Sequence, residues 1–332
     1  MYLRENAKRV EMAATQFDHA KRAYKKGFRL LQLGWTDGNT FLPVNSCLMS
    51  GKKKVCTTKS YDARSNAGKR RLQADPKGTE VMIELLKTAL KHGVKAPYVL
   101  FDSWFSSPNM FHEMNEINLH AVCMLKRTKK HLYRYEGKML DVKTLFNRHK
   151  KRRGRSRYLL SIDVESVIDG KAVPVKLVFV RNRNKRKDYL VLGTSDVRLT
   201  EDEVIQLYGR RWSIEVYFKM CKQHLRLAKY QGISYDGITA HTVTVAVGYM
   251  ILAVQNREET DPRTIGELFF LMVSELSDLT FAEAISYLVS LFKDALENEE
   301  ALEEEIINEI LSQFITKLPT HYKSRFLGME SS

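Results

Sequence analysis

Cysteine is scarce in this sequence and is not arranged for metal or disulfide chemistry. Four cysteines stand among 332 residues, at Cys47, Cys56, Cys123 and Cys221. No two of them form a Cys-x-x-Cys pair, and the nine histidines do not cluster. This spacing argues against a zinc site and against a disulfide framework, and it is typical of a reducing compartment.

Targeting segments and uninterrupted apolar runs are also lacking. No signal peptide is recognisable at the start of the sequence. The one candidate for a membrane span, residues 238–254, is interrupted by three threonines, a histidine and a glycine. It also lacks flanking basic anchors and aromatic belts. We therefore expect a buried core helix there, and a soluble, cytoplasmic protein that does not enter a membrane.

Positive charge, by contrast, is abundant and unevenly spread. Lys and Arg number 54 against 39 Asp and Glu, a formal net charge of +15. From Glu297 to the end there are eight Glu against three Lys or Arg, so the rest of the chain carries about +20. A field of this size attracts polyanions, of which nucleic acid is the commonest. Charge alone leaves open a soluble basic protein without a nucleic-acid partner.

The first hundred residues predict a helix, a hairpin, a loop and a second helix. The hairpin is indicated by Asp37-Gly38 between two apolar runs, a sequence that favours a tight turn. The helix before it rests on helical spacing, and the loop on a basic, Ser-, Thr- and Gly-rich composition. The predicted ranges are 1–26 for the first helix, 28–34 and 40–49 for the hairpin strands, 52–77 for the loop and 79–92 for the second helix, which Gly93 closes.

A buried strand follows at residues 97–102, where four bulky apolar residues precede Asp102. Such a run without alternation is typical of a strand covered on both faces. In open α/β sheets, ligands gather at the carboxyl ends of the strands, which makes Asp102 a candidate functional carboxylate. The alternative is that Asp102 merely caps the following turn. Ser107-Pro108 then opens another helix, and the helix-strand-helix order indicates an α/β layer.

Between residues 120 and 199 the pattern changes to short β-like runs with very basic connectors. We interpret this region as a β-rich subdomain inserted into the α/β fold. The expected strands are 120–125, 158–167, 173–180 and 189–193, and the connectors are 126–134, 148–157 and 181–187. A helix returns at Thr200, an N-cap followed by Glu203, and is expected to run to about residue 227.

One strip of this helix carries four polar side chains of possible function. At 100° per residue, Tyr208, Arg211, Glu215 and Lys222 lie together, between two apolar stripes. One stripe consists of Ile205, Trp212 and Val216, the other of Leu207, Ile214, Phe218 and Leu225. An exposed strip with an i,i+4 Arg–Glu pair is the alternative, stabilising the helix by only a few tenths of a kcal/mol. That alternative leaves the apolar margins unexplained, so we favour an enclosed functional strip.

The four residues resemble a known signature. Their spacing, Tyr208-x2-Arg211-x3-Glu215-x6-Lys222, resembles the YREK signature of the insertion-sequence-four family of DDE transposases. The tetrapeptide 102–105, Asp-Ser-Trp-Phe, looks like the second acidic motif of the same family, and residues 27–43 look like its N-terminal hairpin. The likeness covers roughly residues 4–255.

The resemblance implies an α/β, RNase H-like catalytic core with an inserted β-rich subdomain and a helical C-terminal region. The domain boundaries that we predict are 1–119 and 200–256 for the two parts of the core, 120–199 for the insertion and 257–332 for the helical region with its acidic tail. It also implies metal-dependent strand cleavage and transfer on transposon-end and target DNA, by a homodimer in the synaptic complex. The protein would be nucleoid-associated when bound to DNA.

The resemblance also assigns roles to single residues. Asp102 and Glu215 would be catalytic and would hold metal, in a site of two Mg²⁺ ions for which Mn²⁺ can substitute. Tyr208, Arg211 and Lys222 would contact DNA phosphates, since Arg suits bidentate phosphate recognition and Lys acts as a point charge.

A third carboxylate that the resemblance implies has no match. The family's first Asp ends a central strand just upstream of a segment like residues 4–11, and no apolar strand ending in Asp precedes that segment here. Asp37 lies in the expected hairpin turn and Asp18 in the expected first helix, so neither suits the role. Our hypothesis is an N-terminally truncated transposase, through a mis-assigned start, a frameshift or decay, with two strand edges left unpaired. Translation of the upstream DNA in three frames tests it.

Two alternative functions remain at this point. A truncated, inactive derivative would bind transposon-end DNA or inhibit the full-length enzyme without cleaving. A basic RNA-binding protein ranks last, because no recognised RNA module or aromatic stacking platform is visible.

Overall fold

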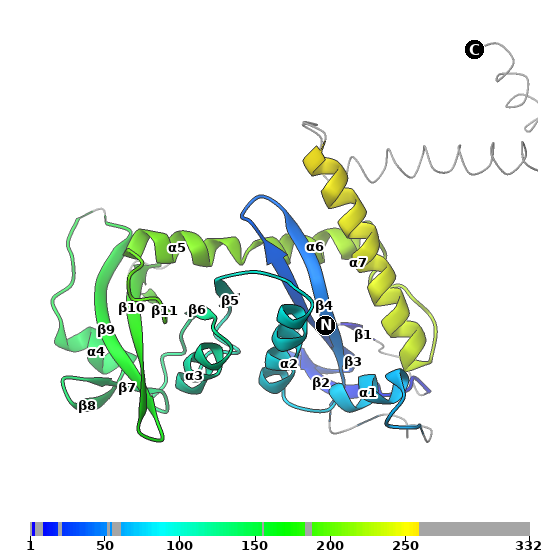
Figure 1. Cartoon of the computed structure of the whole chain (residues 1–332), viewed down its shortest axis with the longest axis horizontal. Helices are drawn as coiled ribbons and strands as arrows, with labels where there is room; N and C mark the ends of the chain where they lie inside the picture. Colours follow the sequence, from blue (N-terminus) through cyan, green and yellow to red (C-terminus); the bar gives the residue numbers. More distant parts are fainter. Residues whose placement is uncertain are drawn as a thin grey trace, which may run out of the picture. The chain divides into compact units, whose positions relative to one another are not determined.

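Two β-sheets and the helices around them form the part of the chain that the computed structural model describes (Figure 1). The described residues are 2–3, 9–18, 22–51, 54, 61–154, 156–182 and 188–258. They belong to one compact unit, Met1–Glu258, and a second unit comprises Glu259–Ser332. The helical region expected at residues 257–332, with its acidic tail, lies outside the described residues apart from its first two.

The first sheet is built on one long strand. It contains β1 (Tyr2–Leu3), β2 (Ala14–Asp18), β3 (Ala23–Thr36) and β4 (Phe41–Met49), all antiparallel. The early part of β3 pairs with β1 and β2, and its residues 29–36 pair with β4. At the β3–β4 turn the Asp37 carboxylate accepts the N–H groups of Asn39 and Thr40 at 2.9 and 2.8 Å. The predicted hairpin is therefore confirmed.

The predicted helix over residues 1–26 is wrong in its described part, which holds β2 and the start of β3. Polar residues of β2 point inward: Gln16 and Asp18 are 6% and 9% exposed. The Gln16 side-chain amide donates to the Met49 carbonyl at 3.3 Å. A polar inner face hides the apolar alternation by which strands are recognised. Asp18 thus ends a strand and does not lie in a helix.

Helices cover this sheet at one side. The predicted loop over residues 52–77 is wrong in part, because α1 (Asn66–Gln73) lies within it, capped by the Ser65 side chain, which accepts from Gly68 N at 3.0 Å. The next helix, α2 (Gly78–Lys91), confirms its prediction. It presents Val81 and Leu85 to β4, and Met82 and Leu86 to the core of the second sheet. α2 therefore joins the two sheets.

The second sheet is mixed and has seven strands, in the order β5-β6-β11-β10-β9-β7-β8. β5 and β6 pair in parallel and the other neighbours are antiparallel. The bounds are β5 (Tyr98–Phe101), β6 (His120–Met124), β7 (Leu132–Tyr135), β8 (Lys138–Asp141), β9 (Tyr158–Ile168), β10 (Lys171–Arg181) and β11 (Tyr189–Thr194), with α3 (Pro108–Glu116) and α4 (Val142–Arg148) between strands. The architecture is a mixed α/β fold, as predicted.

The strands expected between residues 120 and 199 are present as β6, β9, β10 and β11. They continue the sheet that β5 begins, because β11 pairs with β6. The β7–β8 hairpin was not predicted, and its first strand falls partly in a segment expected to be a connector. Its turn is Glu136-Gly137, with φ of 48° and 74°, as a two-residue type I′ turn requires.

The single helix expected from Thr200 onward is divided. α5 (Glu201–Arg210) ends and α6 (Ser213–Gln223) begins around a tight turn at Arg211 and Trp212. Through this turn the backbone N–H groups of residues 211, 212, 214 and 215 bond to carbonyls three residues earlier, the tighter 3₁₀ pattern. The turn changes the angular relation between Tyr208 and Glu215.

The last described helix is α7 (Tyr235–Glu258). Residues on one face, including Ile238, Val245 and Tyr249, are buried, as expected of a core helix. The opposite face exposes Val243 and Ile251, 50% and 53% exposed, so the prediction of a buried core helix holds for one face of α7 and not for the other. By length and composition, Tyr235–Arg257 would suffice to cross a membrane, with a third of its apolar window buried.

The two sheets do not pair with each other. Among the described residues, β3 pairs along residues 29–36 with β4 alone, and β5 pairs with β6 alone. One edge of each strand is therefore without a strand partner, and the two edges line a common cavity. This gap lies beside the predicted functional residues.

Candidate functional site

Four of the five predicted residues come together where β5 ends and α5 meets α6. Asp102 directly follows β5, while Tyr208 and Arg211 come from the end of α5 and the tight turn. Glu215 stands in the first turn of α6. The division of the helix at Trp212 thus places the residues at a junction of elements and not along one uninterrupted strip.

Arg211 is the centre of this group. Its Nη2 donates to Glu215 Oε1 at 2.5 Å, and its Cζ lies 5.6 Å from the centroid of the Tyr208 ring. The Arg211 Nε and the Tyr208 hydroxyl are buried without a hydrogen-bond partner among the described residues. An unsatisfied buried donor costs free energy, so this arginine retains the capacity to bind one more acceptor.

The charge of Asp102 reaches the same arginine. Burial acts to lower the pKa of the Arg211 guanidinium, but the hydrogen bond to Glu215 and the nearby negative charges, Asp102 among them, outweigh it and raise the pKa. Burial raises the pKa of the Tyr208 hydroxyl. Arg211 is therefore a permanent cation that pairs with Glu215 and feels the charge of Asp102, and Tyr208 is a neutral hydroxyl.

Asp102 itself also has a structural role. Its Oδ1 accepts the backbone N–H of Trp104 at 2.7 Å, which is the capping arrangement considered as the alternative from sequence. One carboxylate oxygen is engaged in this way and the other can accept a further ligand. Capping and function are compatible at this residue.

Lys222 stands apart from the other predicted residues. It is exposed, and its Nζ lies 5.9 Å from the Phe218 ring centroid. No hydrogen bond or ion pair joins it to Tyr208, Arg211 or Glu215 in the described part of the chain. Its position near the end of α6 fits a long-range phosphate contact and not a part of the central group.

The expected apolar margins of the strip are only partly present. Trp212 is 63% exposed and Val216 is 41% exposed, so the stripe expected to contain them is open to solvent. The buried residues of α6 are Tyr217 and Cys221 instead. The tight turn rotates α6 relative to α5, which the uninterrupted 100° spacing ignored. The prediction of an enclosed strip is therefore wrong on one side.

The described residues do not fit the metal centre that the resemblance implies. They contain no group of three or more His, Cys, Asp or Glu side chains able to hold a metal ion together. Glu215 is engaged by Arg211, and the third carboxylate has no candidate nearby. Asp37 lies in the hairpin turn, where its other oxygen meets Arg257 at 2.6 Å, and Asp18 ends β2. DDE enzymes generally use divalent metals, but two carboxylates alone do not make the expected set.

Sequence reasoning missed several residues that line the same region. Trp104 is 48% exposed, its carbonyl accepts from Lys126 Nζ at 3.1 Å, and Arg29 Cζ lies 5.0 Å from its ring centroid. Trp104 stands two residues after Asp102, so the sequence held a signal for it. Arg29 and Lys126 contact Trp104 from separate elements, and no local sequence pattern predicts such contacts.

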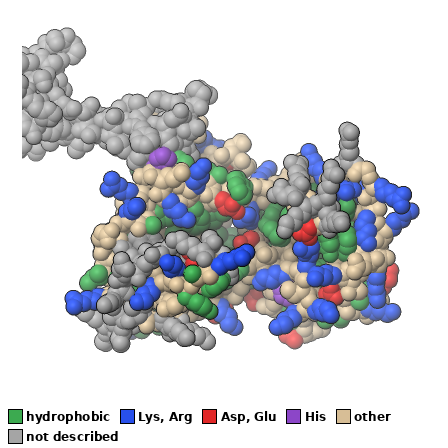
Figure 2. Space-filling view, turned by 180° about the vertical axis from the view of Figure 1, so that it is seen from behind, with side chains coloured by type: hydrophobic (Ala, Val, Ile, Leu, Met, Phe, Trp, Pro, Cys, Tyr) green, Lys and Arg blue, Asp and Glu red, His purple; other side chains and the backbone are tan. Residues whose placement is uncertain are grey.

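Basic side chains extend well beyond this region. Figure 2 shows Lys and Arg spread over both halves of the visible face, with fewer acidic side chains among them. Exposed examples near the second sheet include Lys129, Lys130 and Arg153. Such a surface suits a polyanion whose backbone runs past several elements.

Comparison with known proteins gives a family. No curated protein matches this chain. The family model described as "DDE superfamily endonuclease" matches residues 1–167, just over half of the 332 residues. The matched part contains Asp102 and ends before Tyr208, so it supports the family independently of the YREK-like residues. The chain belongs to the DDE superfamily endonucleases, a family of DNA phosphodiester-cleaving enzymes with an RNase H-like fold.

Proposed function

We propose that this chain is a transposase of the insertion-sequence-four type, which binds the ends of a mobile element and cleaves and joins DNA there. The supporting observation is the ion pair of Arg211 with Glu215, within the electrostatic reach of Asp102, together with an Arg211 Nε that has no hydrogen-bond partner in the described part of the chain. Asp102 and Glu215 are the proposed catalytic carboxylates. Tyr208, Arg211 and Lys222 are the proposed DNA contacts.

Arg211 is suited to a phosphate because of its planar fork. The guanidinium uses one nitrogen for Glu215, and its buried Nε can donate to a phosphate oxygen without displacing that pair. The neutral Tyr208 hydroxyl, which also has no hydrogen-bond partner among the residues that the structure describes, can donate beside it. Together they satisfy two buried polar atoms by binding one anion.

The region around the site suits a DNA strand that leaves the duplex. Trp104 and Trp212 are both exposed, and Arg29 and Lys126 contact the former. Aromatic faces between cations stack bases while the cations bind the backbone. We propose that these tryptophans hold bases next to the cleaved phosphate, that the protein acts as a homodimer, and that it is cytoplasmic and nucleoid-associated when bound to DNA.

The incomplete carboxylate set favours a second candidate function. A relative that binds transposon ends without cleaving them, and inhibits an active transposase, needs the cations but not the third carboxylate. The same purified protein distinguishes the two candidates.

The experiment measures binding and nicking separately. The full chain is mixed with a plasmid and a labelled duplex that carry the ends of the element encoding it, with Mg²⁺ or Mn²⁺. Cleavage by the transposase predicts that Asp102→Asn and Glu215→Gln each reduce nicking by about 100-fold or more while end binding is retained. Glu116→Gln, an exposed carboxylate on α3, is the matched control and should nick normally.

Binding provides the second readout. Arg211→Lys keeps the charge but loses the fork, so we expect about tenfold weaker end binding, a loss of about 1.4 kcal/mol. End binding by the wild type without nicking in either metal supports the inhibitor. Absence of both would contradict the two candidates together.

A further inference from the structure

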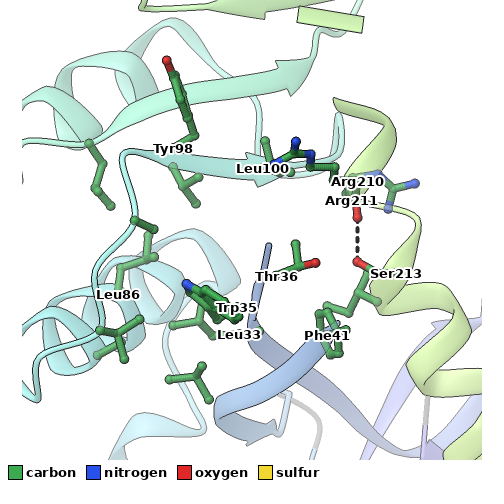
Figure 3. Close-up of a pocket in the computed structure, with 18 of the residues that line it drawn as sticks. Leu33, Trp35, Thr36, Phe41, Leu86, Tyr98, Leu100, Arg210, Arg211 and Ser213 are labelled. Carbon is green, nitrogen blue, oxygen red and sulfur yellow. Dashed lines mark hydrogen bonds between the residues drawn. The ribbon is translucent and has the colours of Figure 1, made fainter. Parts of the chain in front are cut away.

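The proposed catalytic residues lie at one end of the seven-stranded sheet. Asp102 directly follows β5, and Figure 3 shows Leu100 of the same strand close to Arg211, at one end of the cavity that both line. β6 runs parallel to β5 and also ends here, and β11 begins, β10 ends and β9 begins on the same side. The register pairs Arg181, the last residue of β10, with Tyr189, the first of β11. The ends of four further strands therefore continue the line that starts at Asp102.

Cations follow this line of strand ends. Four of them come directly before or after these strands: Lys126 after β6, Arg181 at the end of β10, and Lys151 and Arg152 before β9. We call these four residues the basic rim. The backbone N–H of Arg152 donates to the Leu159 carbonyl at 2.7 Å, which places this segment against the start of β9. Neighbouring strands lie about 4.8 Å apart, so the line from β5 to β9 is about 19 Å long.

Backbone carbonyls hold two of these cations in place. Lys126 Nζ donates to the Trp104 carbonyl at 3.1 Å. Arg181 donates from Nε to the Ser156 carbonyl at 2.8 Å and from Nη2 to the Arg152 carbonyl at 3.1 Å. Over the described ranges, no ion pair joins a residue of the basic rim to a carboxylate. The rim is therefore ordered without being neutralised.

Aromatic rings hold the other two cations. Lys151 Nζ lies 4.5 Å from the centroid of the Phe146 ring, and Arg152 Cζ lies 4.5 Å from that of Tyr158. The Phe146 ring in turn stacks on Tyr189 at the start of β11, with centroids 4.0 Å apart and planes inclined by 20°. A ring attracts a cation through its quadrupole and carries no net charge. The rings therefore orient the two cations and leave their charge available.

Charge that is fixed in this way suits a polyanion. A cation that is paired with a carboxylate exchanges one anion for another when it binds phosphate, as Arg134 would with Glu165 and Arg127 with Asp188. The basic rim has no such pair to break. Ordering a long side chain at an interface also costs binding energy, and the rings and carbonyls restrict these side chains before the ligand arrives.

We propose that the basic rim binds phosphates of the transposon-end duplex, which lies across the ends of β6, β11, β10 and β9. At about 3.4 Å per base pair, the 19 Å from β5 to β9 corresponds to about five or six base pairs. Lys151 and Arg152 should therefore contact phosphates about that far from the cleaved one. These lie on the element's side, because a protein that joins the element to new DNA must retain that side. The identity of the DNA rests on the proposed function, but its binding is measured without cleavage.

The test measures binding of the full chain to a labelled duplex that carries the element's end, at several salt concentrations. Lys151→Met should weaken binding about fivefold and reduce the slope of log Kd against log salt by about 0.9, the value for one phosphate contact. Lys171→Met is the matched control, because Lys171 is exposed and lies at the opposite end of β10. It should change neither quantity.

A ring variant separates the positioning of the cation from its charge. Phe146→Leu keeps every charge, so the salt slope should stay unchanged while binding weakens about threefold, because Lys151 loses its ring. Phe146 also packs against Phe179, so the melting temperature of each variant is measured. Lys151→Met changes a side chain outside this packing, so it tests the rim even where Phe146→Leu does not fold.

Single neutral linkages in the DNA locate the contact. A methylphosphonate five or six base pairs from the cleavage site, on the element's side, should weaken binding by the wild type but not by Lys151→Met. Unchanged affinity and salt slope in a folded Lys151→Met variant would overturn the proposal. Equal affinity for an RNA duplex of the same sequence would assign the rim to RNA instead. A wild type that binds through Lys151 and never nicks would refute the transposase while supporting the rim.

Discussion

The two sheets of this protein are stabilised by different means. The seven-stranded sheet encloses a large apolar cluster to which β5, β6, β9, β10, β11 and the helices α3 and α4 all contribute. The four-stranded sheet has smaller apolar clusters and buries polar side chains, including Gln16, Asp18 and Arg71. Apolar packing dominates in the seven-stranded half, whereas in the four-stranded half a buried ion-pair network between distant segments adds to the apolar packing.

Arg71 makes the central contacts of the four-stranded half. Its Nε donates to Glu11 Oε1 at 2.8 Å and its Nη2 to Asp236 Oδ2 at 2.8 Å. Glu11 also accepts the N–H of Tyr235 at 2.9 Å. The network joins the N-terminal segment, α1 and the start of α7, which lie far apart in the sequence. The four-stranded half therefore depends on a buried ion-pair network, whereas the seven-stranded half depends on the burial of apolar surface.

The largest expected effect comes from Arg71→Met. Removing the buried Arg71 leaves Glu11 without its cation, whereas the half-exposed Asp236 keeps Arg70 at 3.1 Å. We therefore expect a loss of about 3 kcal/mol in the free energy of unfolding, the lower end of the range for a buried pair. The matched control is Arg134→Met in the seven-stranded half, whose pair with Glu165 at 2.6 Å is 40% and 45% exposed. It should cost no more than about 1 kcal/mol. Urea unfolding measures both, and equal losses would break the comparison.

Lowering the pH should destabilise the two halves to different extents, by less than the Arg71 substitution does. The reason is that the carboxylates lose their charge gradually as the pH falls. Burial acts to raise the pKa of Glu11, but the bonds from Arg71 and Tyr235 outweigh it and lower the pKa; the Arg71 hydrogen bond lowers the pKa of Asp236. A carboxyl whose pKa is lower in the folded than in the unfolded state stabilises the fold at pH values above its unfolded pKa. That stabilisation is lost as the pH falls through its folded pKa.

In the seven-stranded half, the hydrogen bond from Arg198 lowers the pKa of Asp196 to about 2, so its contribution persists nearly to that pH. Hydrogen exchange between pH 5 and pH 3 should therefore show β2, β3 and α1 losing protection before β9, β10 and β11. Simultaneous loss in both sheets would argue against the distinction.

The smallest effect concerns two buried tyrosines. The Tyr133 hydroxyl, in the seven-stranded half, has no hydrogen-bond partner among the described residues, whereas Tyr235 donates to the Leu48 carbonyl at 2.7 Å. Tyr133→Phe should be neutral or stabilising by up to about 1 kcal/mol, and Tyr235→Phe should cost about 0.5–1.5 kcal/mol. Thermal unfolding of the two variants provides the measurement, and a destabilised Tyr133→Phe would show that its hydroxyl is satisfied.

The same difference explains which elements the sequence predicts. The hairpin at Asp37-Gly38, the strand before Asp102 and the strands β9 to β11 were predicted because local turn chemistry and apolar runs determine them. β2 and α1 were missed because their inward faces carry Gln16 and Arg71, side chains whose burial depends on partners elsewhere in the chain. Such partners are not visible in a local pattern.

The site was predicted in its composition but not in its geometry. Motif spacing named Asp102, Arg211 and Glu215, which the fold brings to one junction. The break in the helix was missed because Arg211 and Trp212 keep helical dihedrals, with φ of −55° and −59°. Only the hydrogen bonds shorten from four residues to three, a change that residue preferences do not report.

The two open strand edges also bear on how this protein aggregates. Exposed edges pair with the edges of other sheets and so begin aggregates. Here α2 on one face and the α5–α6 junction on the other restrict access to the facing edges of β3 and β5. A folded neighbour presents a whole sheet, which cannot enter between these helices, whereas a single unfolded segment can. Folded molecules should therefore not aggregate through these edges at high concentration. Aggregation should instead begin during synthesis, when unfinished chains expose apolar strands.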